Sequence, residues 1–342
     1  MNNDRAGKEP SSRGWPGRRR RLAALDLGTN NCRLLVVQPE EHGFRVVKSF
    51  SRITRLGEGL AATGRLDEAA MARTIAALGV CARIIAGCGA RRVRCVATEA
   101  CRRAVNGRAF VERVREATGI SLEILDNREE ARLAMLGCAP LVERDARKVL
   151  LLDIGGGSTE IFWLERGAEP GDCRGRAFSL PVGVVTLSES FGDGAEEQAY
   201  RCMVELVGRM AESSGMPPPA NGDAHSIQML GTSGTVTTLA AIHLGLRRYD
   251  RRRVDGVQVS FAALADVAER LRRLDRAGRA AFPCIGRGRA DLVMAGCAIL
   301  EAVHRRWPVD RLRVADRGVR EGILAEMLGQ SLDVVLAGSP AV

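Results

Sequence analysis

The sequence predicts an α/β protein built from two related halves. Strand-length apolar runs alternate with helix-length amphipathic runs along most of the 342 residues, a pattern typical of α/β architecture. A glycine-containing hairpin occurs twice, as LAALDLGTNNCRLLVV from Leu22 and as VLLLDIGGGSTEIFWL from Val149. The aspartates of the two copies, Asp26 and Asp153, are 127 positions apart, and the residues around them keep this spacing. Since each copy opens one half, the repeat indicates an internal duplication.

The first half alternates extended and helical segments. The first hairpin and the β-branched and aromatic stretch HGFRVVKSFSRITRLG predict strands. Residues 67–89 predict a helix, because their apolar residues recur at helical spacing. RRVRCVAT and ISLEILD predict strands on either side of one helix over EACRRAVNGRAFVERVREATG. NREEARLAMLGCAPLV then predicts a helix with Asn127 as its N-cap.

The second half repeats this scheme. Its hairpin at 148–165 is followed by a predicted helix over 196–214, and HSIQMLGTSGTVTTLAAIHLGL predicts a strand, a glycine turn and a helix. Further helices are predicted near 261–275 and 290–306. RLRVADRGVREGILAEML predicts a strand and a final helix after Asp316, which we expect to pack back toward the first half.

Composition and charge narrow the function classes. The chain is 46% apolar and 27% charged, as in soluble globular proteins, and no apolar run approaches the length of a membrane span. Residues 1–21 are basic and lack the apolar stretch of a secretory signal, so we expect a disordered arm on a cytoplasmic protein. The ten cysteines are scattered without a CxxC pair, which favours reduced thiols over disulfides or zinc.

The net charge of +10 favours an anionic partner. Nucleic acid, polyphosphate and nucleotides all qualify, and a solvated, arginine-rich surface is the plain alternative. Only two Tyr, three Trp and eight Phe are present, so stacking platforms for single-stranded bases are scarce. Small polyanions are therefore favoured over nucleic acid.

The two hairpins and a third loop, LGTSGTVTTLA at 230–240, have the chemistry of phosphate sites. Backbone N–H groups of glycine-rich turns can converge on phosphate oxygens, and the third loop adds the N-terminus of a helix. Asp26 and Asp153 end apolar strands and offer the oxygen ligands that Mg²⁺ prefers. The pattern predicts a phosphate-binding cleft between two domains. Glu129 and Glu130 begin the helix before the second hairpin, where they are either catalytic or complement the helix dipole.

Five motifs together resemble the exopolyphosphatase/guanosine pentaphosphate phosphohydrolase (Ppx/GppA) family. They are DLGTNNCRLLV, REEARL, LLLDIGGGSTEI, LGTSGTVTTLA and ADRGVREGIL, in this order between about residues 22 and 328. The resemblance implies two duplicated actin-like domains around an interdomain cleft, a fold shared with sugar kinases and Hsp70 and related to ribonuclease H. It also implies an enzyme that removes the terminal phosphate of inorganic polyphosphate or of guanosine pentaphosphate, the latter as part of the stringent response.

The resemblance also assigns roles to residues and a cofactor. Glu130 is the implied general base, with Asp153 and Glu160 as further catalytic residues. Mg²⁺ is the implied metal, with a monovalent cation as a second candidate, and its expected ligands are Asp26, Asp153 and Glu160. The expected phosphate-binding residues are Gly28, Thr29, Asn30, Arg102, Gly155, Gly156, Gly157, Ser158, Thr159, Gly231, Thr232, Ser233 and Gly234.

Two departures from the family pattern bear on these roles. VATEACRRA stands where relatives carry a Thr-Ser-Ala pattern, so Glu99 brings a negative charge close to Arg102. The chain also ends about fifteen residues after REGILAEM, without the helical region of the long relatives. It therefore resembles the short, two-domain members, and the preferred polyphosphate length stays open.

We expect a basic arm at 1–21, one domain at 22–135, a second at 136–330 and a tail at 331–342. Two other function classes remain open: an alarmone or nucleotide sensor without turnover, and an ATP-dependent phosphotransferase of the same fold. A homodimer also remains open.

Overall fold

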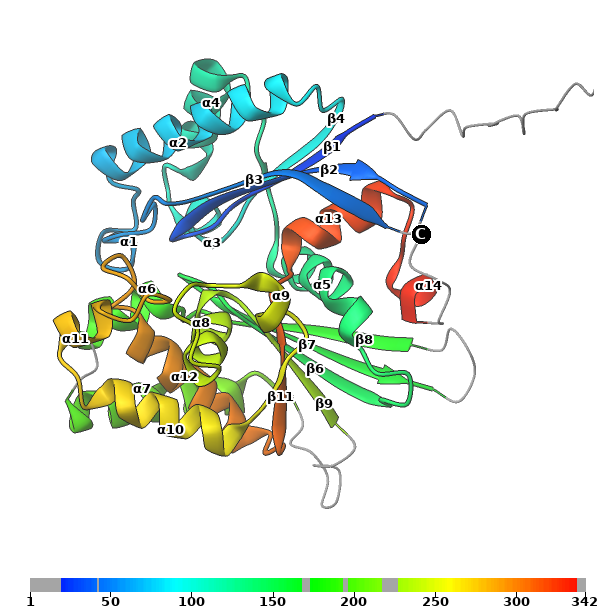
Figure 1. Cartoon of the computed structure of the whole chain (residues 1–342). Helices are drawn as coiled ribbons and strands as arrows, with labels where there is room; N and C mark the ends of the chain where they lie inside the picture. Colours follow the sequence, from blue (N-terminus) through cyan, green and yellow to red (C-terminus); the bar gives the residue numbers. More distant parts are fainter. Residues whose placement is uncertain (1–19, 42, 168–172, 193–195, 217–226, 337–342) are drawn as a thin grey trace, which may run out of the picture.

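The computed structural model describes residues 20–41, 43–167, 173–192, 196–216 and 227–336. Nearly all of the predicted basic arm and the end of the predicted tail lie outside these residues. The strands form two β-sheets, and Figure 1 shows one in each half of the chain, with α5 (Asn127–Cys138) and α13 (Val319–Met327) between them. The α/β class and the alternating order of elements predicted from the sequence are confirmed.

The first sheet is mixed, and its central strand carries the first aspartate. β1 pairs antiparallel with β2 and parallel with β4. Helices α2 and α4 cover its outer face (Figure 1), where their apolar residues share a core with the sheet. In order across the sheet, the strands are β3 (Phe44–Ile53), β2 (Asn31–Pro39), β1 (Leu22–Leu27), β4 (Arg92–Ala97) and β5 (Glu123–Ile124), and the helices of this half are α1 (Leu60–Thr63), α2 (Glu68–Gly87), α3 (Glu99–Arg103) and α4 (Gly107–Thr118).

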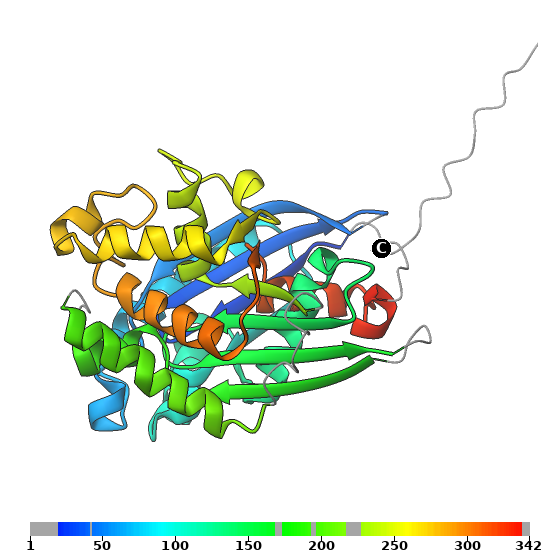
Figure 2. The same cartoon turned by 90° about the horizontal axis from the view of Figure 1, so that it is seen from below.

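The second sheet repeats this arrangement around the second aspartate. β6 pairs antiparallel with β7 and parallel with β9. The strands, in sheet order, are β10 (Gln258–Ser260), β11 (Arg311–Ala315), β9 (Ile227–Thr232), β6 (Lys148–Ile154), β7 (Thr159–Arg166) and β8 (Cys173–Leu180). The helices after β8 are α6 (Val184–Phe191), α7 (Glu197–Ser213), α8 (Gly234–His243), α9 (Arg251–Val254), α10 (Phe261–Arg272), α11 (Arg276–Ala280) and α12 (Val293–Arg306). Figure 2 shows α7, α10 and α12 gathered on one face of this sheet.

Two helices join the halves. α5 (Asn127–Cys138), followed by the short helix η1 (Ala139–Leu141), packs on β7 and β8, and α13 (Val319–Met327) packs on α5 and β1. The final helix thus returns to the first half, as predicted. α14 (Leu332–Leu336) follows and packs near η1. The crossing of α5 and α13 is close because glycine lies at the contact. A Cβ at Gly322 of α13 would come 1.9 Å from the Leu133 carbonyl oxygen of α5.

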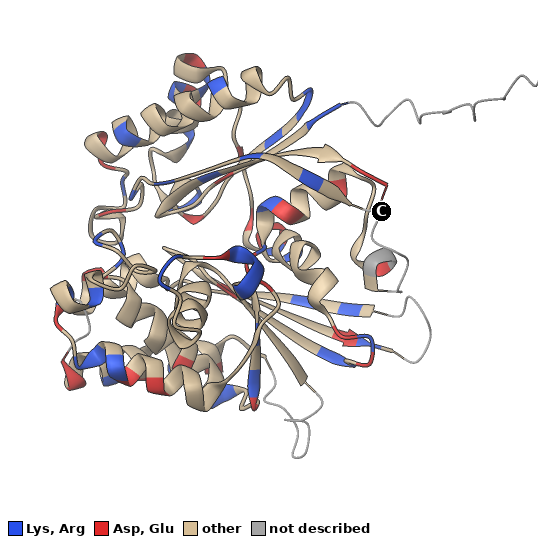
Figure 3. Cartoon of the chain, in the orientation of Figure 1, with Lys and Arg blue, Asp and Glu red and all other residues tan. Residues whose placement is uncertain are grey.

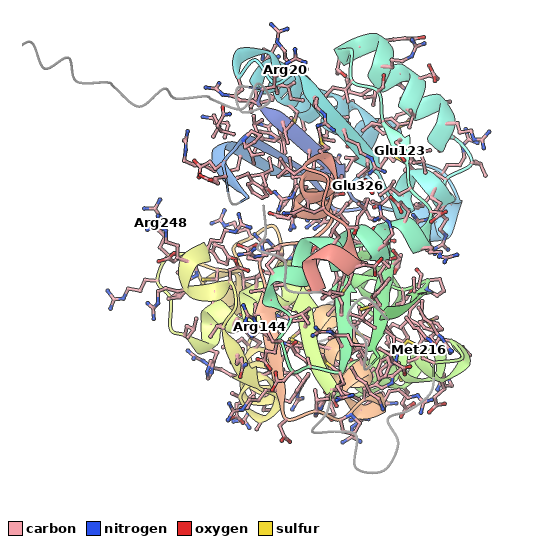
Figure 4. All side chains as sticks on the ribbon, turned by 90° about the vertical axis from the view of Figure 1, so that its right-hand side faces the viewer. Arg20, Glu123, Arg144, Met216, Arg248 and Glu326 are labelled. Atoms are coloured by element: carbon pink, nitrogen blue, oxygen red, sulfur yellow. The ribbon has the colours of Figure 1, made fainter. Side chains whose placement is uncertain are left out.

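An ion network fastens this crossing to the first sheet. Arg94 on β4 donates to Glu123, Glu129 and Glu326, and Arg132 on α5 donates to Glu129 and Glu326. Glu123 and Glu326 are labelled in Figure 4, close to each other at the end of α13. Four elements from different parts of the chain, β4, β5, α5 and α13, are therefore held together at the point where the halves meet.

Two local predictions differ from the structure, and a third is not tested by it. The helix expected over EACRRAVNGRAFVERVREATG is two helices, α3 and α4, because the Asn106 side chain bonds to the backbone of Leu66. The N-cap of α5 is Asp126 rather than Asn127, with its carboxylate accepting from the Glu129 N–H. The predicted domain boundary at 135/136 falls inside α5 and stays a prediction.

Helix α2 bears on the expectation of no membrane span. Among the described residues it is long and apolar enough, by length and composition, to cross a membrane. Core helices of soluble proteins meet the same criterion, which makes this weak evidence. Met71, Leu78 and Cys81 of α2 are buried in the core of the first half.

Candidate active site

The two predicted aspartates occupy equivalent places in the two sheets. Asp26 lies opposite Arg33 in the β1–β2 register, and Asp153 lies opposite Glu160 in the β6–β7 register. Because parallel strands end at the same edge, Thr232 of the third loop lies beside Asp153 on the neighbouring strand β9. The two hairpins and the third loop therefore place their predicted residues at the ends of β1, β6 and β9.

Each hairpin turn is closed by the same hydrogen bond. The Gly28 N–H donates to the Asn31 carbonyl, and the Gly155 N–H donates to the Ser158 carbonyl, each at 2.9 Å. This equivalence supports the duplication inferred from the sequence.

The carbonyl groups of both turns point back into their own half. Gly57 donates to the Thr29 carbonyl, and Val184 and Val185 donate to the carbonyls of Gly155 and Gly156. Within the described part of the chain, the N–H groups at positions 29, 30, 156 and 157 donate no hydrogen bond. Successive free N–H groups in a turn form a concave anion site.

The two turns approach each other closely. A Cβ at Gly156 would lie 2.9 Å from Thr29 Cβ and 3.2 Å from Asn30 N, and a Cβ at Gly157 would lie 2.8 Å from Thr29 Oγ1. The glycines are needed here because another side chain would occupy the space between the halves. The Asn30 Oδ1 atom is buried and has no hydrogen-bond partner among the described residues, so a polar group of the turn is available to a ligand.

Glu130 lies in the first turn of α5 and is buried, with 8% of its surface exposed. Its Oε2 accepts a hydrogen bond of 3.0 Å from Arg102. Arg102 also donates to Glu99 and to the Leu125 carbonyl. Glu129, by contrast, points to Arg132 and Arg94 in the ion network of the crossing. Of the two glutamates, Glu130 is the one whose charge interacts with Glu160 and Asp26 of the hairpins.

The buried carboxyl groups influence one another. Burial raises the pKa of Glu130 well above its ordinary value, the Glu160 carboxylate raises it further, and Arg102 lowers it. Burial also raises the pKa of Asp153 to about 6, with a further contribution from Asp26, and the pKa of Glu160 to about 7. The pKa of Asp26 is raised by burial and lowered by Arg33. Burial and mutual repulsion therefore disfavour the ionised forms of these four groups, and a bound cation would favour them.

Three arginines at this site were missed in the sequence analysis. A Cβ at Gly234 in the third loop would lie 3.6 Å from Arg289 Nη1 and 3.8 Å from Arg33 Nη2. The charges of Arg289 and Arg320 both act on the half-buried Arg33, and the pKa of Arg33 is lowered by burial and by Arg320. Converging guanidinium groups suit a bound polyphosphate. The repeat itself held a signal, because Arg33 takes the place in the first hairpin that Glu160 takes in the second.

Some predicted phosphate ligands have their side chains engaged elsewhere. The Thr159 hydroxyl donates to the Val182 carbonyl, and the Thr232 hydroxyl donates to the Arg317 carbonyl. Ser233 has a φ of 106° and its hydroxyl accepts from Thr235 N, while Gly231 packs against Leu312. The assigned roles of these residues, and of the other predicted site residues, stay predictions.

The donor set suits a magnesium ion. Asp26, Asp153 and Glu160 are carboxylates whose charges act on one another, and a divalent cation would compensate them. No three acidic, cysteine or histidine side chains in the described residues form a ready-made metal cage. Mg²⁺ commonly binds one or two carboxylates together with water and substrate phosphates, so the residues fit an ion that arrives with its substrate.

Comparisons with known proteins point in one direction. A family model described as the Ppx/GppA phosphatase family matches residues 35–331. The chain is similar to Exopolyphosphatase 2 of Mycobacterium tuberculosis, with 32% identity over 327 residues that cover 90% of this chain and 99% of that protein. It is also similar to Exopolyphosphatase 1 of Mycobacterium leprae, with 27% identity over 323 residues covering 92% and 91% of the two chains.

Solved structures agree with the fold. The crystal structure of the Aquifex aeolicus member of the Ppx/GppA family matches with a TM-score of 0.74 and 30% identity, covering 91% of this chain and 98% of that one. An exopolyphosphatase from Cytophaga hutchinsonii matches with a TM-score of 0.80 at 23% identity, over 92% and 99% of the two chains, and shows the fold alone. The predicted actin-like fold is confirmed.

Proposed function

Because the chain belongs to the Ppx/GppA phosphatase family, we propose that it hydrolyses the terminal phosphoanhydride bond of inorganic polyphosphate. Guanosine pentaphosphate carries the same terminal linkage and is the second substrate that the motifs imply. The observation that carries the proposal is the pair of facing turns, whose free N–H groups lie between the two halves with the buried Glu130 nearby. We place this chemistry in the cytoplasm, as the sequence suggests.

In the proposed reaction, Glu130 is the general base. Its carboxylate accepts a proton from a water molecule, whose oxygen forms a bond to the terminal phosphorus while the bridging P–O bond breaks. The products are orthophosphate and a chain one phosphate shorter. Arg102 favours the ionised form of Glu130 that accepts the proton.

The other groups bind and orient the substrate. The N–H groups of the two turns hold the terminal phosphate, and Arg33, Arg289 and Arg320 neutralise the phosphates next to it. Asp26, Asp153 and Glu160 are the residues that would hold Mg²⁺, which supplies compensation of the charge on the phosphate oxygens. A monovalent cation beside the phosphate chain remains a second candidate.

The test is phosphate release by the Glu130→Gln variant. With Mg²⁺ present, the unmodified enzyme is expected to release phosphate from tripolyphosphate, long-chain polyphosphate or guanosine pentaphosphate. Loss of the base is expected to lower kcat by about 10²- to 10⁴-fold. Glu129→Gln is the matched control, because Glu129 lies in the same helical turn but pairs with Arg132.

Each outcome discriminates between functions. Equal losses in both variants would assign the effect to α5 rather than to a base. No release from any substrate by folded enzyme, with tight alarmone binding, would favour a sensor, and transfer of phosphate from ATP to an acceptor would favour a phosphotransferase.

A further inference from the structure

An arginine-rich segment beside the candidate site has no role in the reaction described above. The segment RRYDRRR covers residues 247–253 and includes α9. Four of its side chains, which we name the basic loop, are exposed and form no ion pair within the described residues. They are Arg247, Arg248, Arg252 and Arg253.

The acidic groups around the basic loop are already engaged. The Asp250 carboxylate caps α9 by accepting from the Arg252 N–H. Asp255 accepts from Arg317, and Asp316 accepts from the Tyr249 hydroxyl and lies 3.6 Å from Arg251. The charge of the basic loop is therefore not compensated by these neighbours.

The basic loop is continuous with the candidate active site. Arg251 donates to the Asp316 carbonyl and to Glu321 at the start of α13. Arg320 is the neighbour of Glu321, and its charge acts on Asp26 and Arg33 in the site. Figure 3 shows the positive charge of α9 close to α13, in agreement with the Arg251–Glu321 bond, and in Figure 4 Arg248 extends away from the second half into solvent. A row of arginines thus leads from the site to the surface.

We propose that the basic loop binds the distal phosphates of a linear polyphosphate whose terminal phosphate occupies the active site. The inference rests on the proposed function and deepens it, because it makes the enzyme prefer long chains. Guanidinium groups pair with phosphate oxygens in a fork geometry, and a linear polyphosphate presents a phosphate for each of several arginines. Single-stranded nucleic acid fits less well, because the one aromatic residue of the segment, Tyr249, is hydrogen-bonded to Asp316.

The experiment removes the charge of the basic loop and keeps polar, hydrogen-bonding side chains in its place. The variants are R247Q/R248Q, R252Q/R253Q and all four combined, and the control is R83Q/R108Q on α2 and α4, where the arginines are also exposed. For the quadruple variant, KM for long-chain polyphosphate is expected to rise roughly tenfold, since an exposed ion pair contributes up to about fivefold in affinity. The KM for tripolyphosphate and kcat for both chains are expected to stay unchanged. The salt dependence of long-chain KM is expected to weaken.

Binding to the Glu130→Gln protein, measured by titration with long-chain polyphosphate and with tripolyphosphate, tests the loop independently of turnover. If the basic-loop substitutions weaken the binding of long-chain polyphosphate but not of tripolyphosphate, the proposal is supported. This holds even if the unmodified protein releases no phosphate; only the proposed function would then fail. An unchanged long-chain affinity, or an equal loss for both chain lengths, overturns it. Loss of single-stranded RNA binding at unchanged chain-length preference would assign the basic loop to nucleic acid and also overturns it.

Discussion

Arg102 is the residue that lowers the pKa of Glu130 against the effects of burial and of the Glu160 charge. One Nη atom donates to Glu130 and to the Leu125 carbonyl, while Glu99 accepts from the rest of the guanidinium group. Arg102 is thus shared between two carboxylates. We interpret it as a positioning residue that favours the ionised form of Glu130, with Glu99 holding the guanidinium group in place.

Replacing Arg102 by Ala is expected to shift the acidic limb of the pH–rate profile to higher pH. Arg102 lowers the pKa of Glu130, so its loss leaves a smaller ionised fraction of the base at neutral pH. We expect kcat at pH 7 to fall roughly tenfold or more and to recover partly at higher pH. The measurement is kcat against pH for the unmodified enzyme, R102A and R102K.

R102K keeps the charge and is expected to restore much of the profile. Arg103→Ala is the control, since Arg103 is the exposed neighbour on the same helix. An R102A profile that loses amplitude at every pH without moving would show that Arg102 binds phosphate instead.

At the scale of elements, the two hairpin turns must approach each other before the site is complete. Gly156→Ala places a methyl group 2.9 Å from Thr29 Cβ, so the turns must separate by a few tenths of an ångström. We expect kcat to fall by about 10²-fold, as for other small misplacements of reacting groups. The stability of the variant is expected to change little, because the added methyl group lies between the halves rather than in a core.

Kinetics and thermal unfolding of G156A check this expectation. Gly208→Ala on α7 is the control, because a Cβ there meets nothing within 4 Å. It is expected to keep full activity and to gain about 0.5–1 kcal/mol of stability from helix propensity. Full activity of G156A would mean that the turns do not hold the phosphate together.

Much of this fold could be predicted because its signals are local. The aspartates of the two hairpins were found from the repeat, and their strands from apolar runs. The break between α3 and α4 could not be found in this way, because Asn106 ends the helix through bonds to Leu66, forty positions away. The local periodicity of apolar residues does not reveal a hydrogen-bond partner that is distant in the sequence.

The same limit applies to the candidate site. Arg289 and Arg320 come from the loop before α12 and from α13, and only the folded chain brings them toward Arg33 and the hairpin turns. Arg33 could have been identified from the sequence, since the register of the duplication places it opposite Asp26, as Glu160 is placed opposite Asp153. An arginine in a strand, however, is usually a solvated surface residue.

At the scale of the whole molecule, contacts remote from α5 and α13 hold the halves together. Arg55, with a φ of 48°, donates to Asp291 at 2.9 Å, and the Gly59 N–H donates to Glu189 at 2.8 Å. Each contact joins the segment after β3 in the first half to the second half. We interpret the structure as a closed arrangement of the two halves, which a hinge motion would open by breaking these few bonds.

Arg55→Ala is expected to favour an open arrangement. The radius of gyration in small-angle scattering should exceed that of the unmodified protein without substrate, and polyphosphate should reverse the difference. KM is expected to rise several-fold, because closure must then be driven by substrate. Arg45→Ala is the control, since Arg45 pairs with Glu40 within the first half; identical scattering and KM for R55A and R45A would contradict the role of this contact.

The buried carboxyl groups also link stability to pH. An acid whose pKa is higher in the folded than in the unfolded state stabilises the fold at low pH, and this contribution is lost as pH rises through the folded pKa. For Asp153 and Glu160 the folded values are about 6 and about 7. Glu129, whose pKa Arg132 lowers, is ionised in both states above pH 5 and contributes no slope there. His304, whose pKa burial lowers, contributes in the opposite direction.

We therefore expect the Tm of the metal-free protein to fall between pH 5 and 8. The two groups together account for a few kcal/mol, at about 1.4 kcal/mol for each unit of pKa shift. Mg²⁺ is expected to raise Tm more at pH 8 than at pH 5, because it binds the ionised carboxylates. In the D153N/E160Q variant both the slope and the Mg²⁺ effect should shrink, while the His304 contribution remains. The contrary result would be a Tm of the metal-free protein that rises steadily with pH, with an equal Mg²⁺ effect at pH 5 and pH 8. It would mean that these carboxyl groups are already paired in the fold and are not the ligands of a cation.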